Sequence, residues 1–108
     1  MSSSQPMREP TFLVLAALAR HPAHGYRLGK EIEELSEGRV KLLAGTLYAV
    51  LDRLHRDGLV VQGDPEPGDG PPRRTYSITA EGRVALEHEV RRLQASAAIG
   101  ELGLGWSG

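Results

Sequence analysis

The strongest hydrophobic pattern in the chain begins at Ala44. Four large apolar side chains recur at i, i+3, i+4 and i+7 and therefore share one face of a helix: Leu47, Val50, Leu51 and Leu54. We expect Gly58 to end this helix, because glycine adopts without strain the left-handed backbone that follows many helices. A short apolar run, Leu59–Gln62, comes directly after it and predicts a strand.

A long loop separates this strand from the next one. Residues 63–72 contain three Gly, four Pro and three acidic residues, a composition that excludes helix and central strand. Arg73–Ile78 alternates and predicts a strand that pairs back on Leu59–Gln62. Helix, strand, long loop and strand is the order of a winged helix-turn-helix. We therefore predict a mainly α fold with a small β-hairpin, in which residues 63–73 form the wing.

Two helices are predicted before this unit. The first has Thr11 as its N-cap, extends over Phe12–Arg20 and cannot continue past Pro22. The second runs from about Gly25 to Ser36. Its side chains divide into an inward group and a solvent-facing group: Leu28, Ile32 and Leu35 against Lys30, Glu31, Glu33 and Glu34. Residues 39–42 are expected to add a brief third strand.

A fourth helix is predicted over Ala80–Ala98, with Thr79 as its N-cap and an i, i+4 pair between Glu87 and Arg91. Its apolar stripe has no predicted neighbour in the chain, and the first helix is apolar nearly all round. Either the first helix is the central core helix, or a partner chain covers part of it; we favour the second interpretation. The predicted dimer interface therefore draws on both helices: Phe12, Leu15, Leu86, Val90 and Leu93.

These elements give a domain organisation. Residues 1–9 are predicted to be a flexible N-terminus, residues 10–79 the winged helix-turn-helix, residues 80–99 a C-terminal dimerisation helix, and residues 100–108 a flexible Gly-rich tail. At 108 residues the chain has room for one modest core. The longest apolar run, Phe12–Ala19, is far too short to span a membrane, so we expect a cytoplasmic protein without a membrane partner.

Composition narrows the possible chemistry. The chain has no cysteine, which excludes disulfides, thiolate metal sites and a thiol nucleophile. His21 and His24 form an HxxH pair without a carboxylate cluster at ligand spacing, so neither a metal nor a cofactor is expected. The sequence also lacks a phosphate-binding glycine loop, a plausible triad and paired carboxylates in an apolar setting. We therefore do not expect an enzyme.

The formal net charge of −1 argues weakly against nucleic-acid binding, but the charges are unevenly distributed. Around the third helix and the wing base, six cations against two acids give +6 − 2 = +4: Arg39, Lys41, Arg53, Arg56, Arg73 and Arg74 against Asp52 and Asp57. A helix with one buried face and one cationic face fits a DNA major groove.

We assign Thr46, Tyr48 and Arg53 to base edges or nearby phosphates, and Arg56, Arg73 and Arg74 to the DNA backbone. For Tyr48 the alternative is that its ring packs at the start of the helix. A twofold dimer would place two such helices about 34 Å apart on an inverted-repeat operator. The alternative function is a winged helix that binds proteins and not DNA; exposed aromatic and aliphatic side chains in place of this cationic surface would favour it.

The sequence also resembles a known family, the PadR-type transcriptional regulators. His24-Gly25-Tyr26 is similar to the HGY that begins the second helix of the family. Residues 45–48 (GTLY), 51–54 (LDRL) and 57–59 (DGL) resemble its GTLYP…L.RLE..GLI signature, and residues 72–82 its PPRKYYSLTEEG. The resemblance implies a dimeric repressor, and for some members an aromatic small-molecule effector at the dimer interface, where Trp106 is a candidate lining residue.

The sequence departs from the family pattern at a few positions. Ala49 stands where the family often has Pro, and His55 replaces the usual Glu. The wing tip is acidic at Asp64, Glu66 and Asp69, which disfavours contact between the tip and phosphates. For this reason the predicted wing contacts are Arg73 and Arg74 at its base.

Overall fold

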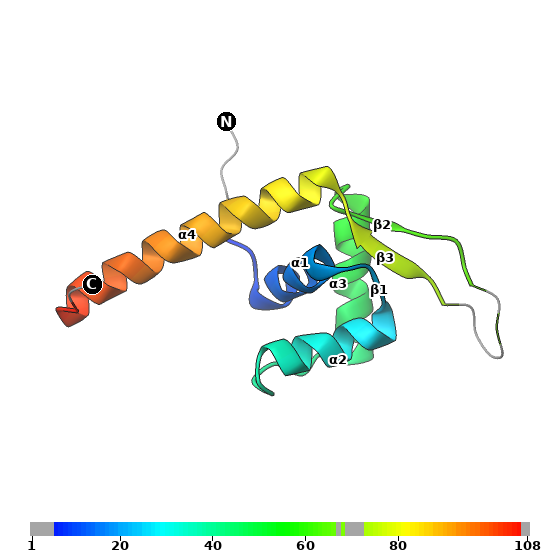
Figure 1. The fold of residues 1–108 in the computed structure, drawn as a ribbon, viewed down its shortest axis with the longest axis horizontal. Helices are drawn as coiled ribbons and strands as arrows, with labels where there is room; N and C mark the ends of the chain where they lie inside the picture. The colour runs from blue at the N-terminus through cyan, green and yellow to red at the C-terminus, as the bar shows by residue number, and fades with distance from the viewer. Residues whose placement is uncertain (1–5, 67, 69–72, 107–108) are drawn as a thin grey trace.

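The computed structural model describes residues 6–66, 68 and 73–106. Its elements follow in the order α1 (Glu9–Arg20), β1 (Ala23–His24), α2 (Gly25–Leu35), α3 (Ala44–Arg56), β2 (Val60–Gln62), β3 (Thr75–Ile78) and α4 (Ala80–Leu104). Helices α1, α2 and α3 pack beside a three-stranded antiparallel sheet, and α4 extends away from this body (Figure 1). The predicted mainly α fold with a β-hairpin wing is confirmed.

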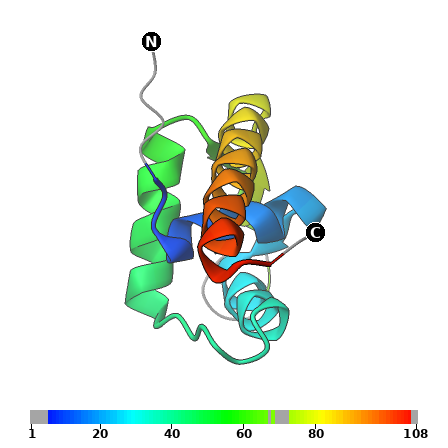
Figure 2. The same ribbon diagram turned by 90° about the vertical axis from the view of Figure 1, so that its left-hand side faces the viewer.

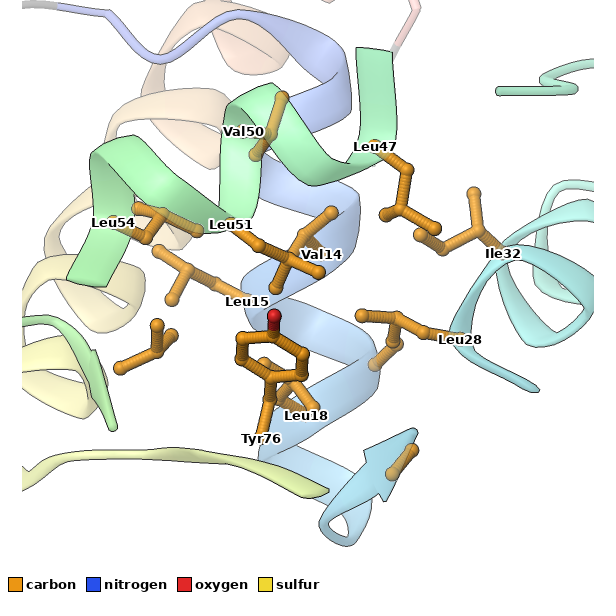
Figure 3. Packing of buried hydrophobic residues seen from close by; sticks show 13 residues of the cluster. Val14, Leu15, Leu18, Leu28, Ile32, Leu47, Val50, Leu51, Leu54 and Tyr76 are labelled. Carbon is orange, nitrogen blue, oxygen red and sulfur yellow. The ribbon is translucent and has the colours of Figure 1, made fainter. Parts of the chain in front are cut away.

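The core forms where α1 meets α2, α3 and the sheet. The predicted inner face of α3 is buried as the periodicity required, and it packs against the buried side of α1 (Figure 3). On α1 itself, Val14, Leu15, Ala17 and Leu18 are buried by the rest of the same chain. Because α2, α3, α4 and β3 all pack against α1, the helix is a core helix of its own chain, and contact of a partner with its half-buried residues stays a prediction.

Leu15 is therefore a correction to the predicted dimer interface. Its side chain is 0% exposed within the protomer and offers no surface to a partner. The start of α1 was also misplaced. The helix begins at Glu9 with Arg8 as its N-cap and without a side-chain cap, so Thr11 lies inside the first turns.

The sheet contains the predicted hairpin and one strand that was not predicted. Val60 pairs with Ile78, Val61 with Ser77 and Gln62 with Tyr76, as expected for the two strands that border the wing. The third strand is β1, which pairs with the opposite edge of β3 through Ala23 and His24. Residues 39–42 contain no strand and connect α2 to α3.

Helix α2 has two side chains in environments opposite to those predicted. Leu35 is 44% exposed because it lies one turn beyond the end of the core. Glu31 is buried, with its Oε1 atom 3.0 Å from Nε2 of His21 and 3.7 Å from a guanidinium nitrogen of Arg20. Its other oxygen, Oε2, is buried without a hydrogen-bond partner among the described residues. The end of α1 thus covers a carboxylate expected in solvent.

The turn between α3 and β2 follows the predicted logic. Gly58 has a φ of 78°, its N–H donates to the carbonyl of His55, and the N–H of Leu59 donates to the carbonyl of Leu54. This is the hydrogen-bond pattern of a Schellman motif, which satisfies the last carbonyls of a helix. It directs the chain from α3 straight into the hairpin.

Helix α4 begins at its predicted cap. The Thr79 hydroxyl accepts from the N–H of Gly82 at 2.9 Å and donates to the carbonyl of Gly58 at 2.8 Å, which joins α4 to the α3–β2 turn. The helix is longer than predicted: it continues to Leu104, and Gly105 follows with a φ of 74°. Residues 100–104 are helical and not a loose tail, and Figure 2 shows the last turns in line with the rest of the helix.

Glu89 and the segment before α1 hold the middle of α4. The Glu89 carboxylate is 4% exposed and accepts from Nε of Arg92 at 3.0 Å, whereas the predicted Glu87–Arg91 pair is not formed. These hydrogen bonds from Arg92 hold the pKa of Glu89 below its ordinary value of 4.5; a hydrogen bond from the Met7 backbone acts in the same direction, and burial opposes both. Residues 7–9, expected to be flexible, thus lie against α4 or within α1.

This arrangement predicts a pH-dependent contribution to stability. A carboxyl whose pKa is lower in the folded than in the unfolded state stabilises the fold above the unfolded pKa, and this stabilisation is lost as the pH falls through the folded pKa. Glu89→Gln should therefore melt below the wild type at pH 7, and the difference should narrow as the pH falls below 4.5. Thermal unfolding followed by circular dichroism measures this. Glu87→Gln is the control, and a pH-independent difference for Glu89→Gln would contradict the assignment.

Candidate nucleic-acid interface

The exposed side of α3 is bordered by two open hollows, one on each flank. The wing-side hollow has a volume of about 490 Å³ and lies between α3, the start of α2 and the base of the wing. Its lining is aromatic and cationic: His24, Gly25, Tyr26, Tyr48, Arg73, Arg74 and Tyr76. Three predicted site residues, Tyr48, Arg73 and Arg74, are therefore brought together.

The second hollow, which we name the α1-side hollow, has a volume of about 310 Å³. The segment before α1, the first turn of α1 and the exposed part of α3 form its walls: Arg8, Pro10, Thr11, Gly45, Thr46, Ala49, Val50 and Arg53. Thr46 and Arg53 thus face the opposite flank of α3 from Tyr48. Arg56 is exposed near the end of α3 and lines neither hollow.

Tyr48 lies across the start of α2. A Cβ atom added to Gly25 would come within 2.4 Å of the Tyr48 hydroxyl oxygen and 2.7 Å of its ring, so glycine is required here for the ring to approach the backbone. The Tyr48 side chain nevertheless remains 43% exposed. The ring therefore packs at the start of α2, its exposed portion borders the wing-side hollow, and contact of Tyr48 with DNA stays a prediction.

The cations around α3 differ in their partners. Among the described residues, Arg53, Arg56, Arg73 and Arg74 have no carboxylate within 4 Å, whereas Arg39 is bound to Glu9 at 2.6 Å and Lys41 lies 3.9 Å from Glu33. Arg39 and Lys41 are thus neutralised and do not add to the charge that we had counted around α3. Of the six cations counted around α3, the four arginines are thus the ones without a carboxylate partner among the described residues.

The base of the wing is tied to the body through His24. Its Nε2 atom is 3.1 Å from Oε1 of Glu66, and its Nδ1 atom is 3.4 Å from the carbonyl oxygen of Arg74. Glu66 also forms an isolated bridge with Arg73, to whose carbonyl its N–H donates at 2.8 Å. One wing-tip acid is therefore directed toward a histidine. Asp64 is exposed, and Asp69 lies outside the described residues.

Three residues of α2 that we had not assigned extend this surface. Tyr26, Arg27 and Lys30 line a further hollow of about 410 Å³ together with Arg73, and the Lys30 ammonium lies 5.4 Å from the centre of the Tyr26 ring. A signal was present in the sequence, since residues 26–30 carry two cations and a tyrosine on the polar side of α2. The same hollow contains Glu31 and Glu34, which reduce its positive charge.

The predicted dimer residues other than Leu15 lie at or near the surface. Phe12 and Leu86 are half-buried, whereas Val90 is 37% and Leu93 40% exposed. Further large apolar side chains, outside the predicted dimer set, are exposed at the end of α4 and directly after it: Ile99, Leu102, Leu104 and Trp106. Exposed apolar area of this extent on one helix is typical of an interaction surface.

No three His, Cys, Asp or Glu side chains in residues 6–66, 68 and 73–106 come together as a metal site would require. In the same part of the chain, none of the helices combines the length and hydrophobicity needed to cross a membrane.

Comparison with known proteins identifies the family. The model of the transcriptional regulator PadR-like family matches residues 14–88, from the first helix to the middle of α4. The chain belongs to this family. Transcriptional regulator Rv3488 of Mycobacterium tuberculosis is similar to this PadR-like regulator, with 38% identity over 81 residues that cover 75% of this chain and 72% of that protein.

Solved structures agree with this assignment. A PadR family transcriptional regulator from Eggerthella lenta superposes with a TM-score of 0.68 at 35% identity, over 85% of this chain and 79% of the other. Bacillus subtilis PadR, solved in complex with operator DNA, superposes with a TM-score of 0.70 at 20% identity, over 80% of this chain and 48% of the other. The second likeness concerns the fold alone.

Proposed function

We propose that this PadR-like regulator binds double-stranded DNA through α3 and the base of the wing. The observation that carries the proposal is the set of unpaired arginines on and beside the exposed side of α3, in a fold that Bacillus subtilis PadR shares in its complex with operator DNA. A helix of this kind fits the major groove, and cations on its flanks neutralise phosphates. Residues 10–79 then form the DNA-binding domain.

We assign Thr46, Tyr48 and Arg53 to bases or nearby phosphates, and Arg56, Arg73 and Arg74 to the DNA backbone. The protein-interaction alternative has less support, because arginines without a carboxylate partner occupy the exposed side of α3 and most of the large exposed apolar side chains lie on α4 or directly after it. Tyr26, Leu43 and Tyr48 are the exposed apolar side chains near α3.

We further propose that the protein acts as a homodimeric repressor that binds an inverted repeat, with Phe12, Leu86, Val90 and Leu93 in the dimer interface. The exposed apolar positions of α4 support this arrangement. Release of the operator by an aromatic small molecule, with Trp106 near its site, rests on the family resemblance. Displacement of bound duplex by aromatic compounds tests that finer statement.

Binding isotherms at several salt concentrations test the DNA-binding surface. Arg73→Ala and Arg74→Ala should weaken operator and unrelated duplexes alike, and should flatten the salt dependence by about one charge per half-site. Thr46→Ala and Arg53→Ala should instead reduce the difference in binding free energy between operator and unrelated DNA. The reduction should be roughly 1–3 kcal/mol where Arg53 loses a bidentate base contact. All four side chains are exposed, so the variants should fold normally.

Operator duplexes for these measurements can be selected from a random pool. If Arg53→Ala and Arg73→Ala both fold normally and leave operator affinity unchanged, this surface does not bind DNA, and the protein-interaction alternative gains support.

A further inference from the structure

The α1-side hollow contains Arg8, a cation outside the proposed DNA-binding residues. Arg8 precedes α1 directly and lines the hollow with Thr11, across from Thr46 and Arg53 on α3. None of the lining residues is acidic, and among the described residues neither arginine has a carboxylate within 4 Å. The adjacent acid, Glu9, is bound to Arg39 and does not compensate these charges.

This hollow is the counterpart of the wing-side hollow across α3. Each contains two arginines and hydroxyl-bearing side chains, and no carboxylate is among the described residues that line either hollow. The other hollows described above and at the end of α2 include Glu31, Glu34 or Glu37. Figure 1 shows the start of α1 and the wing on opposite sides of α3. Arginines without a carboxylate partner among the described residues therefore border α3 on both flanks.

A helix in the major groove has a phosphate chain on each side of it, because the groove is only about 12 Å wide. We infer that Arg8, assisted by Thr11 and Arg53, binds a DNA backbone phosphate on the groove wall opposite the wing side. This inference rests on the proposed DNA-binding function and extends it to a segment that the sequence pattern suggested was mobile. Arg73 and Arg74 bind the other wall, so that α3 is held between two phosphate contacts.

The fold also indicates which wall this is. Helix α4 runs away from the body on the same side of α3 as the start of α1, whereas the wing projects to the other side (Figure 1). In a dimer joined through α4, the Arg8 contact lies toward the centre of the operator. The Arg73 and Arg74 contacts lie toward its outer ends.

The first experiment measures duplex affinity by fluorescence anisotropy over a series of salt concentrations, with the full chain, a selected operator and a duplex of unrelated sequence. Arg8→Ala should lower the affinity for both duplexes by the same factor, and should reduce the magnitude of the slope of log K against log salt by about 0.9 per protomer. Arg8→Lys should retain most of the slope, because a phosphate contact needs the charge. Arg91→Ala removes an exposed cation from α4 and should leave both values unchanged.

The second experiment locates the contact. Each modified operator carries one uncharged methylphosphonate linkage, at a central or at an outer position. The wild type should bind both modified operators less tightly than the unmodified one. The central substitution should have no further effect on Arg8→Ala, and the outer one no further effect on Arg73→Ala.

The outcomes separate this inference from the proposed function. If Arg73→Ala weakens binding while Arg8→Ala keeps wild-type affinity and slope, Arg8 does not contact DNA, and the DNA-binding function stands. If Arg8→Ala lowers the affinity for the operator but not for the unrelated duplex, Arg8 contacts a base and the phosphate assignment is wrong. If neither variant changes binding although both melt like the wild type, the DNA-binding surface itself is misassigned.

Discussion

Among Gly→Ala substitutions at the described glycines, Gly82→Ala is expected to destabilise the protein most. A Cβ atom at this position would lie 2.2 Å from the carbonyl oxygen of Leu59 and 2.7 Å from Cγ1 of Ile78. The first of these is backbone, and it accepts the N–H of Thr79 at 3.0 Å, so it cannot move without breaking the junction between the hairpin and α4.

Overpacking together with one lost hydrogen bond should lower the free energy of unfolding by about 3–4 kcal/mol. For a domain of this size, that corresponds to a fall of at least roughly 12 °C in melting temperature. Thermal unfolding followed by circular dichroism measures the change.

Gly103→Ala is the matched control for this experiment. It adds the same methyl group to a glycine of the same helix, where an added Cβ would meet nothing within 4 Å. Alanine replaces glycine in a helix with a gain of up to about 1 kcal/mol, so this variant should melt at or slightly above the wild-type temperature. Equal melting of Gly82→Ala and the wild type would show that α4 does not pack against Leu59 as described.

Leu93→Glu is expected to convert the proposed dimer into monomers. Leu93 is 40% exposed in the protomer, so a glutamate there does not enter the protomer core. In the dimer it would place two unpaired carboxylates in an apolar interface, which strongly disfavours association.

Loss of the dimer should also lower the affinity for the operator, because a monomer bound at one half-site no longer gives the second half-site a high effective concentration of a linked protomer. The expected loss is on the order of 10²- to 10⁴-fold. Sedimentation and anisotropy measure the two effects.

His88→Glu serves as the control, because it adds the same negative charge to an exposed position on a different face of α4. It should remain dimeric and bind the operator with little change. A dimer of unaltered stability in Leu93→Glu would exclude this part of α4 from the interface. A monomer that binds the operator as tightly as the wild type would mean that dimerisation is not needed for recognition.

The local features of the fold could be predicted from the sequence because their causes are local. The spacing of Leu47, Val50, Leu51 and Leu54 determines which face of α3 is buried, since a helix repeats every 3.6 residues. The capping hydrogen bonds at Gly58 and at Thr79 join residues of the same helical turn, so these capping roles could be inferred from residue type. The Pro- and Gly-rich composition of residues 63–72 likewise predicted the loop.

The length of α4 was predicted incorrectly for a physical reason that is also local. Gly100 and Gly103 each disfavour a helix, which suggested that the helix ends before them. A helix that already exists gains one hydrogen bond for each added residue without a new nucleation cost. Here α4 therefore continues through both glycines and ends at Leu104, where Gly105 takes the left-handed conformation.

Other features depend on which segments of the chain meet in three dimensions, and residue type and spacing do not predict these contacts. Glu31 appeared to face solvent by its helical position, but the end of α1 covers it with Arg20 and His21. Leu15 appeared available to a partner until α1 was found enclosed by the rest of its own chain. Arg8, distant in sequence from α3, lines the same hollow as Arg53 because α1 packs against that helix. Residue type and spacing determined the elements and their buried faces, whereas contacts between distant segments determined which charges are free at the surface.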